Sequence, residues 1–316
     1  MRSFKDFMQD RVREYYSQAS IGQDFFTASE LDKAFGIALS EHLYEFIKRM
    51  DHPILLELGG GNGSLAYDIL NFLRDKHTEL YKRLTYYIYE RSPYLIDIQK
   101  KRLKDFEGKV FWIKELIPMD GVIFSNEFFD CLPVHVIKGG RELYVDGQNF
   151  LWKDVSDERI LSFIRRMGYT HLEQVVEVCL ECVDFLQEVS KHLRIGYHIV
   201  IDYGYTSEEL YRYPEGTVVG YKSHRLVMDL LKEMQPFDMS AMVNFSALIS
   251  YGNDMGLFTL SLQNLRDFLL LSPSFLHELE KLSFSEKPDD IERLSRLKTM
   301  LISMGDRFKV LIQKKL

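Results

Sequence analysis

The chain has 316 residues, of which 46% are hydrophobic and 28% charged, and its formal net charge at pH 7 is −7. This composition is typical of a soluble globular protein, and the length allows one elaborated domain or two small ones. The negative charge argues against a general nucleic-acid-binding protein, which needs a basic surface to neutralise phosphates. No apolar stretch approaches the roughly 18–20 residues of a membrane-spanning helix, which argues against insertion into a membrane.

The first 16 residues, MRSFKDFMQDRVREYY, include acidic side chains and lack the apolar core of a secretory signal. We therefore expect the protein in the cytoplasm. Its three cysteines, Cys131, Cys179 and Cys182, are too few for a disulfide framework. Cys179 and Cys182 form a C-x-x-C inside a run that favours a helix, and no second pair of ligands has the spacing of a zinc site. We interpret them as plain thiols and expect no metal site.

Residues 1–50 are predicted to be helical with one break. Aromatic and apolar residues recur at helical spacing in FKDFMQDRVREYY, at 4–16, and in ELDKAFGIALSEHLYEFIKRM, at 30–50. The stretch between them is predicted to be a loop, in which Thr27 or Ser29 can cap the second helix.

From residue 54, short apolar segments alternate with amphipathic ones. The predicted strands cover 54–58, 85–90, 109–113 and 121–126, and the predicted helices cover 64–84 and 93–106. Strands that alternate with helices in this way form a doubly wound, mostly parallel α/β sheet with both faces covered.

The alternation is interrupted at 134–154, where GG and DG pairs lie between β-rich runs and indicate a hairpin insertion. A long helix over 171–193 is predicted to lead into a fifth strand at 197–205. Residues 205–250 have little regular pattern and form a second predicted insertion.

The C-terminal part of the chain is predicted to return to the sheet. A strand at 257–262 is followed by two helical runs and a last strand at 307–313. This order suits a seven-stranded sheet with an added edge strand.

Four glycines in five positions follow the first strand, in the segment ILLELGGGNGSLA at 54–66. In open α/β sheets, ligands bind at the carboxyl ends of the strands, next to the first strand. Glycine permits positive φ angles and lets a ligand approach the backbone. Since a tight strand-to-helix turn needs only one or two glycines, we interpret this segment as a ligand-binding loop.

Two nucleoside-containing ligands fit the loop to different degrees. The dinucleotide pattern G-x-G-x-x-G fails from Gly59, because position 64 is serine, but a shifted register from Gly61 fits its permissive form. The pattern Glu57-x-Gly59-x-Gly61-x-Gly63 fits better. It is similar to the first motif of Rossmann-like methyltransferases that use S-adenosylmethionine.

Acidic and amide side chains end two further strands. Glu90 ends TYYIYE and can bind two ribose hydroxyls, as an acid does for both NAD and S-adenosylmethionine. In FSNEFFDCLPVH, at 124–135, Asn126 and Glu127 are expected at the carboxyl edge of the sheet. Glu127 and Asp130 can pair with a cationic methyl acceptor. Phe128 and Phe129 would line the pocket around this acceptor.

Several segments together resemble the MidA-like family of S-adenosylmethionine-dependent methyltransferases, which includes a mitochondrial complex I assembly factor that methylates protein arginine. The matching segments are QDFFTASELDKAFG at 23–36, LELGGGNGSLAYDIL at 56–70, SNEFFDCLPVH at 125–135, IDYGY at 201–205, VVGYKSH at 218–224, DMSAMVNFSAL at 238–248 and MGDRFKVL at 304–311. Their order and spacing make the combined resemblance specific.

The resemblance implies a Rossmann-like class I methyltransferase fold and assigns roles by position. The cofactor-binding residues it implies are Thr27, in a segment like a lid, and Glu57, Gly59, Gly61, Gly63, Glu90 and Asn126. Glu127 is the first candidate for holding the methyl acceptor and Asp130 the second. His135 and His224 are candidate proton acceptors.

The resemblance also implies one methyltransferase domain over 1–316. Its parts are an N-terminal helical cap or lid at 1–50, a cofactor-binding half at 54–130, and the insertions at 134–154 and 205–250.

The chain departs from the family pattern in places. Where the family has L-G-P-G-R-G, Asn62 replaces the arginine, and where it has D-L-T-A-D-V-D-F, Met242 and Asn244 replace two acids. If those acids hold an arginine substrate in the family, the acceptor here can differ.

The expected function is transfer of a methyl group from S-adenosylmethionine to an arginine of a protein client, such as a subunit of respiratory complex I type. A non-catalytic assembly chaperone that binds S-adenosylmethionine is the alternative. An NAD-dependent oxidoreductase is a third interpretation, for which we find no group of residues suited to hydride transfer. The expected partners are a protein client and, in a homodimer, a second copy of the chain.

Overall fold

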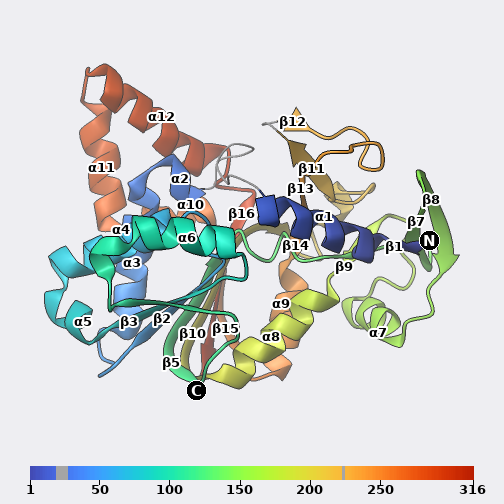
Figure 1. The fold of residues 1–316 in the computed structure, drawn as a ribbon, viewed down its shortest axis with the longest axis horizontal. Helices are drawn as coiled ribbons and strands as arrows, with labels where there is room; N and C mark the ends of the chain where they lie inside the picture. Colours follow the sequence, from blue (N-terminus) through green and yellow to red (C-terminus); the bar gives the residue numbers. More distant parts are fainter. Residues whose placement is uncertain (19–27, 223–224) are drawn as a thin grey trace. The chain divides into compact units, whose positions relative to one another are not determined.

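A computed structural model describes residues 1–18, 28–222 and 225–316 (Figure 1). The chain divides into two compact units, which are described separately below. The first comprises the described part of Met1–Phe25 with Phe128–Gln187 and Gly204–Tyr251, and the second comprises the described part of Phe26–Glu127 with Glu188–Tyr203 and Gly252–Leu316. None of the helices in the described residues combines the length and apolar character that a membrane span requires.

The second unit is built on a seven-stranded, mostly parallel sheet. In spatial order its strands are β15 (Phe258–Asn264), β16 (Phe308–Lys315), β10 (Leu193–Tyr205), β5 (Met119–Asn126), β2 (Ile54–Leu58), β3 (Thr85–Tyr89) and β4 (Val110–Ile113). The strands from β10 to β4 are parallel, whereas β16 is antiparallel to both of its neighbours. This arrangement confirms the predicted fold class. The C-terminal strand lies inside the sheet, and β15 forms the edge.

Helices cover the sheet because their apolar faces and the strands share one core. The helices of this unit are α2 (Ala28–Leu31), α3 (Lys33–Ile47), α4 (Ser64–Lys76), α5 (Thr78–Arg83), α6 (Pro93–Arg102), α10 (Leu265–Leu270), α11 (Pro273–Ser283) and α12 (Pro288–Ile302). Apolar side chains of α3, α4, α10, α11 and α12 join those of the strands in a single core cluster. The helix predicted over 64–84 is broken at His77, whose φ of −137° lies outside the helical range.

The first unit contains two antiparallel sheets. The larger has the order β1 (Arg2–Ser3), β7 (Arg141–Asp146), β6 (His135–Lys138) and β9 (Val176–Val178), with β8 (Asn149–Asp154) paired to β7. The smaller has the order β12 (Arg225–Leu226), β11 (Val219–Lys222) and β13 (Asp238–Ser240). The short β14 (Val243–Asn244) pairs with the end of β10. In the segment 134–154, β6, β7 and β8 pair antiparallel in sequence order.

The helices that lie wholly or mostly in the first unit are α1 (Phe4–Gln18), α7 (Glu158–Met167), α8 (Leu180–His192) and α9 (Phe245–Asp254). The described part of residues 205–250 has more regular structure than the sequence suggested. Met239 in β13, and Phe237 just before this strand, are buried in one cluster with apolar side chains of α1.

The prediction of one helix over 171–193 is wrong in its first half. Val176–Val178 form β9, which pairs with β6, and α8 begins only at Leu180. The β-branched residues gain more from pairing and burial in the sheet than from extending the helix.

The interpretation of Cys179 and Cys182 as plain thiols is also wrong, since the structure joins them in a disulfide. Cys179 lies before the first turn of α8 rather than inside a helix. The two Cα atoms are 5.3 Å apart, which is within the range that a disulfide needs.

The central strands approach one another closely at Gly121, which gives a test of the fold. Its φ is +147°, and a Cβ there would lie 2.0 Å from the carbonyl oxygen of Ile54. We expect Gly121→Ala to lower the free energy of unfolding by more than about 3 kcal/mol, because backbone atoms must move. Urea titration would measure this loss.

Gly108→Ala is the matched control. Gly108 also has a positive φ, of +77°, but a Cβ there would meet no atom within 4 Å. It should cost only about 1 kcal/mol. Similar costs for the two variants would contradict the register of β2 with β5.

Candidate functional site

Three parallel strands of the second unit end at one edge of the sheet. The register pairs Leu58, the last residue of β2, with Tyr89 of β3 and with Ser125 of β5. The residues that follow these positions are Gly59, Glu90 and Asn126. The sheet therefore brings together three segments that the sequence predicted to bind the cofactor.

The glycine loop has a backbone that only glycine adopts readily. Gly59, Gly61 and Gly63 have φ values of 70°, 51° and 81°. The N–H of Gly59 donates to the carbonyl oxygen of Tyr89 at 3.0 Å, which ties the loop to β3. A Cβ at Gly61 would meet no atom within 4 Å, so this part of the loop faces open space. The loop thus exposes backbone atoms to a ligand.

Gln99 of α6 connects the loop to the neighbouring acid. Its Nε2 donates to the carbonyl oxygen of Gly61 at 2.9 Å and to Oε2 of Glu90 at 3.4 Å. Its Oε1 accepts from Nε1 of Trp112 at 2.8 Å. Sequence reasoning missed this fully buried residue, although its place four residues after the buried Leu95 was a usable signal.

The carboxylate of Glu90 has a fixed orientation. Its Oε1 accepts from the backbone N–H groups of Arg91 and Ser92, both at 2.9 Å. The side chain is only 8% exposed. Burial raises its pKa, while the hydrogen bonds from Ser92, Arg91 and Gln99 oppose this shift. A carboxylate held in this way is positioned to accept hydrogen bonds from a pair of hydroxyl groups.

Glu57 lies inside the sheet. Its Oε2 accepts from the hydroxyl of Tyr86 on β3 at 2.7 Å, and its exposed fraction is 2%. Burial raises its pKa to about 7, the Tyr86 hydrogen bond opposes this shift, and the charge of Glu90 adds to it. Its hydrogen bond links the end of β2 to the beginning of β3.

Glu127 has an unusual backbone at the end of β5. Its φ is +54°, and among the described residues it is the one non-glycine residue with a positive φ. Such a conformation costs an L-residue roughly 1–2 kcal/mol. The N–H of Glu127 donates to the carbonyl oxygen of Ile201 at 2.9 Å, and Nδ2 of Asn126 donates to its Oε1 at 3.1 Å. These contacts hold a carboxylate beside the last residue of the strand.

The N-terminal segment touches the glycine loop through α2. Nδ2 of Asn62 donates to Oε1 of Glu30, and Oδ1 of Asn62 accepts from the N–H of Ser64 at 2.9 Å. The residue that replaces the family's arginine therefore joins the loop to this segment. Thr27 lies outside the described residues.

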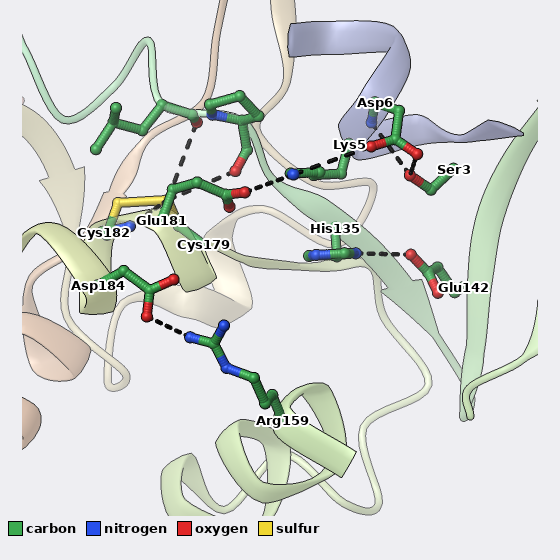
Figure 2. Close-up of polar contacts among 12 residues, drawn as sticks. Ser3, Lys5, Asp6, His135, Glu142, Arg159, Cys179, Glu181, Cys182 and Asp184 are labelled. Carbon is green, nitrogen blue, oxygen red and sulfur yellow. Dashed lines mark hydrogen bonds and ion pairs between the residues drawn. A yellow bond between two sulfur atoms is a disulfide. The ribbon is translucent and has the colours of Figure 1, made fainter. Parts of the chain in front are cut away.

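The other predicted catalytic residues belong to the first unit or lie outside the described ranges. Asp130 is 8% exposed, and its carbonyl oxygen accepts from the N–H of Ala241 at 2.9 Å. Nδ1 of His135 lies 2.7 Å from Oε1 of the buried Glu142 (Figure 2). Sequence reasoning missed Glu142, which fixes the orientation of this ring. His224 lies outside the described residues.

Within the described ranges, no group of three or more His, Cys, Asp and Glu side chains is placed to hold a metal ion.

Comparison with known families identifies the family of this chain. Residues 38–263 match the model of a family described as "Putative S-adenosyl-L-methionine-dependent methyltransferase". The chain belongs to this family. The match confirms the resemblance noted in the sequence, and the protein is an S-adenosylmethionine-dependent methyltransferase.

Two curated relatives carry more specific names. The chain is 26% identical to "Protein arginine methyltransferase NDUFAF7, mitochondrial" of Danio rerio, over 91% of this chain and 76% of the relative. It is 25% identical to "Protein arginine methyltransferase NDUFAF7 homolog, mitochondrial" of Drosophila melanogaster, over 91% of this chain and 74% of the relative.

Two crystal structures share the fold. A protein from Burkholderia thailandensis bound to S-adenosyl-homocysteine matches with a TM-score of 0.82 and 23% identity, over 99% of this chain and 87% of that one. A second, native structure from this organism matches with a TM-score of 0.82 and 25% identity over the same shares.

The residues at the edge of the sheet fit the cofactor of this family. The loop at Gly61 leaves room where a side chain would otherwise stand. Glu90 presents a buried, oriented carboxylate of the kind that binds a ribose diol. Gln99 holds the loop and this carboxylate together.

The buried Glu57 predicts a pH dependence of stability. The pKa of Glu57 is raised from 4.5 to about 7 on folding. Its contribution to the free energy of unfolding is therefore fully present below pH 4.5 and is lost as the pH rises through 7. The loss amounts to about 3 kcal/mol. We expect Glu57→Gln to remove this part of the pH dependence, as measured by urea unfolding between pH 4.5 and 8.

Glu79→Gln serves as the control, because the side chain of Glu79 is 86% exposed on α5. It should leave the wild-type slope in place. An unchanged slope in Glu57→Gln would show that Glu57 is ionised in the folded protein over the whole range.

Proposed function

We propose that the protein transfers a methyl group from S-adenosylmethionine to an arginine side chain of a protein client. The observation that carries this proposal is the carboxylate of Glu127, held in a strained backbone conformation at the end of β5. Strain of this kind is concentrated at functional sites. The names of both curated relatives support arginine as the acceptor.

Glu90 and the glycine loop are proposed to bind the cofactor. The carboxylate of Glu90 would accept hydrogen bonds from the two ribose hydroxyls, and Gly59, Gly61 and Gly63 would let the cofactor lie against the backbone. Asn126 would orient Glu127 through its side-chain amide.

Glu127 is proposed to hold the acceptor. S-adenosylmethionine, when bound, supplies an electrophilic methyl group on a sulfonium sulfur. A carboxylate can accept two parallel hydrogen bonds from a planar guanidinium, which fixes the direction of the attacking nitrogen. Held in this way, one nitrogen of the guanidinium would face the methyl group that the bound cofactor would supply. Holding two reactants in the right geometry can remove about 7–11 kcal/mol of a reaction barrier.

Asp130, His135 and His224 stay predictions. Glu142 orients the ring of His135, which suits a proton acceptor but equally suits a structural pair. Activity of the corresponding variants would decide between these roles.

The client and the compartment also belong to the proposal. A subunit of respiratory complex I type is the client that the resemblance suggests. The cytoplasm, predicted from the sequence, stays a prediction, since the names of both curated relatives include the word mitochondrial.

Variants at position 127 test the role of Glu127. The purified protein is incubated with methyl-labelled S-adenosylmethionine and an extract of its own source from which the native protein has been removed. The wild-type protein should transfer label to a protein band, and the label should be recovered as methylarginine. Glu127→Gln should lower incorporation about 100-fold, because the guanidinium loses its charged partner. Its affinity for S-adenosylmethionine, measured by calorimetry, should change little.

Two further variants serve as controls. Glu127→Gly should be inactive but more stable by about 1 kcal/mol, because glycine adopts the positive φ without strain. Glu90→Gln should weaken cofactor binding about tenfold or more, since it removes charged hydrogen bonds. Cofactor binding without any transfer would favour the chaperone alternative, and full activity of Glu127→Gln would overturn the role of Glu127.

A further inference from the structure

The disulfide between Cys179 and Cys182 lies next to the segment that follows the end of β5. Cys179 is the residue after β9, which pairs with β6 through Val178 and His135. Its Sγ lies 3.7 Å from the carbonyl oxygen of Pro133, two residues before His135. The disulfide therefore borders the junction at which this segment enters β6.

Both sulfurs contact backbone carbonyl groups of this segment. Sγ of Cys179 also lies 4.0 Å from the carbonyl oxygen of Leu132, and Sγ of Cys182 lies 3.8 Å from that of Phe129. As thiols, both cysteines can donate a weak S–H···O hydrogen bond to these oxygens. In the disulfide there is no S–H group, so these donors are lost. The redox state of the pair thus changes the hydrogen bonds that the backbone carbonyl groups of Phe129, Leu132 and Pro133 can accept.

The surroundings of Cys179 favour thiol chemistry. The N–H of Cys182, in the first turn of α8, points at Sγ of Cys179 at 3.1 Å. A backbone donor and the start of a helix both stabilise negative charge on a sulfur. Nζ of Lys5 lies 2.7 Å from Oε1 of Glu181, the acid between the two cysteines, and offsets its charge (Figure 2). Cys179 is half-buried, whereas Cys182 is 7% exposed.

The disulfide between Cys179 and Cys182 is also suited to reversible reduction. It closes a loop with only two residues between the cysteines, so the chain entropy it removes from the unfolded state is small. Both cysteines line a small cavity together with Phe129, Val134, Glu177 and Asn244. A change at the sulfurs therefore reaches the packing around Phe129.

We propose that Cys179 and Cys182 form a thiol–disulfide exchange site whose redox state sets the packing of residues 129–134. The oxidant is a low-molecular-weight disulfide, of which glutathione disulfide is the test case. This inference does not depend on the identity of the methyl acceptor, and its test measures thiols rather than methyl transfer.

The exchange proceeds in two steps. The thiolate of Cys179 attacks one sulfur of glutathione disulfide, so that a bond forms between Cys179 and glutathione while the bond between the glutathiones breaks and one glutathione leaves. Cys182 then loses its proton and attacks the sulfur of Cys179, which releases the second glutathione. The two cysteines lose two electrons and two protons, and one glutathione disulfide becomes two glutathiones.

Redox titration of the full chain tests the exchange site. The protein is equilibrated with mixtures of glutathione and its disulfide, the free thiols are trapped with a maleimide, and the intact mass gives their number. Two thiols should disappear together as the mixture becomes more oxidising, and Cys131→Ser should show the same transition. Persistence of both thiols in the most oxidising mixture would overturn the proposal.

Single-cysteine variants test the order of attack. Cys182→Ser should accumulate one glutathione on Cys179, because the second step is blocked. Cys179→Ser should accumulate little, since Cys182 is buried. Equal labelling of the two variants, or glutathione on Cys131 alone, would contradict the role of Cys179 as the attacking thiol.

Hydrogen exchange tests the effect on packing. Amides in residues 129–134 should exchange about threefold to tenfold more slowly in the reduced protein, in which both thiols bond to backbone carbonyls. Cys131→Ser should show the same difference. Equal exchange in the two redox states would overturn the packing effect while leaving the exchange site itself in place.

Discussion

The parallel pairing of β2 with β3 and β5 is the constraint on which the proposed cofactor site depends. This pairing ends three strands in one row, so that the glycine loop, Glu90 and Asn126 follow at the same edge of the sheet. A shift of one strand by a single residue would move its terminal side chain to the other face and separate these groups. This register requires glycine at position 121, because any larger residue there would meet the backbone of Ile54.

Two side chains, those of Gln99 and Glu127, complete the proposed binding surface at these strand ends. Gln99 reaches from α6 to both the loop and Glu90, so the helix and the strand ends form one hydrogen-bonded unit. Glu127 keeps a conformation that most residues avoid and presents its carboxylate beside Asn126. Gln99 holds the glycine loop to Glu90, and Glu127 presents the carboxylate that we propose to hold the methyl acceptor. Because the chain belongs to a family of S-adenosylmethionine-dependent methyltransferases, we propose methyl transfer as the chemistry of this arrangement.

Much of this site could be predicted from the sequence because its signals are local. Consecutive glycines after an apolar strand, and an acid at the end of the next strand, have a meaning that does not depend on distant residues. Gln99 could not be assigned in this way, because its partners Gly61 and Trp112 are distant along the chain. The same limit explains β9 and the disulfide. Pairing with β6 overrides the helical pattern before Leu180, and only this boundary places Cys179 ahead of the helix.

We propose that S-adenosylmethionine binds at the edge of the sheet where β2, β3 and β5 end. A crystal structure of this protein with S-adenosylhomocysteine, the product of methyl transfer, tests it most directly. We expect both ribose hydroxyls to donate to the carboxylate of Glu90 and the ligand to lie against the backbone at Gly59–Gly63. A ligand bound elsewhere, or one whose ribose is out of hydrogen-bonding distance of Glu90, would contradict it.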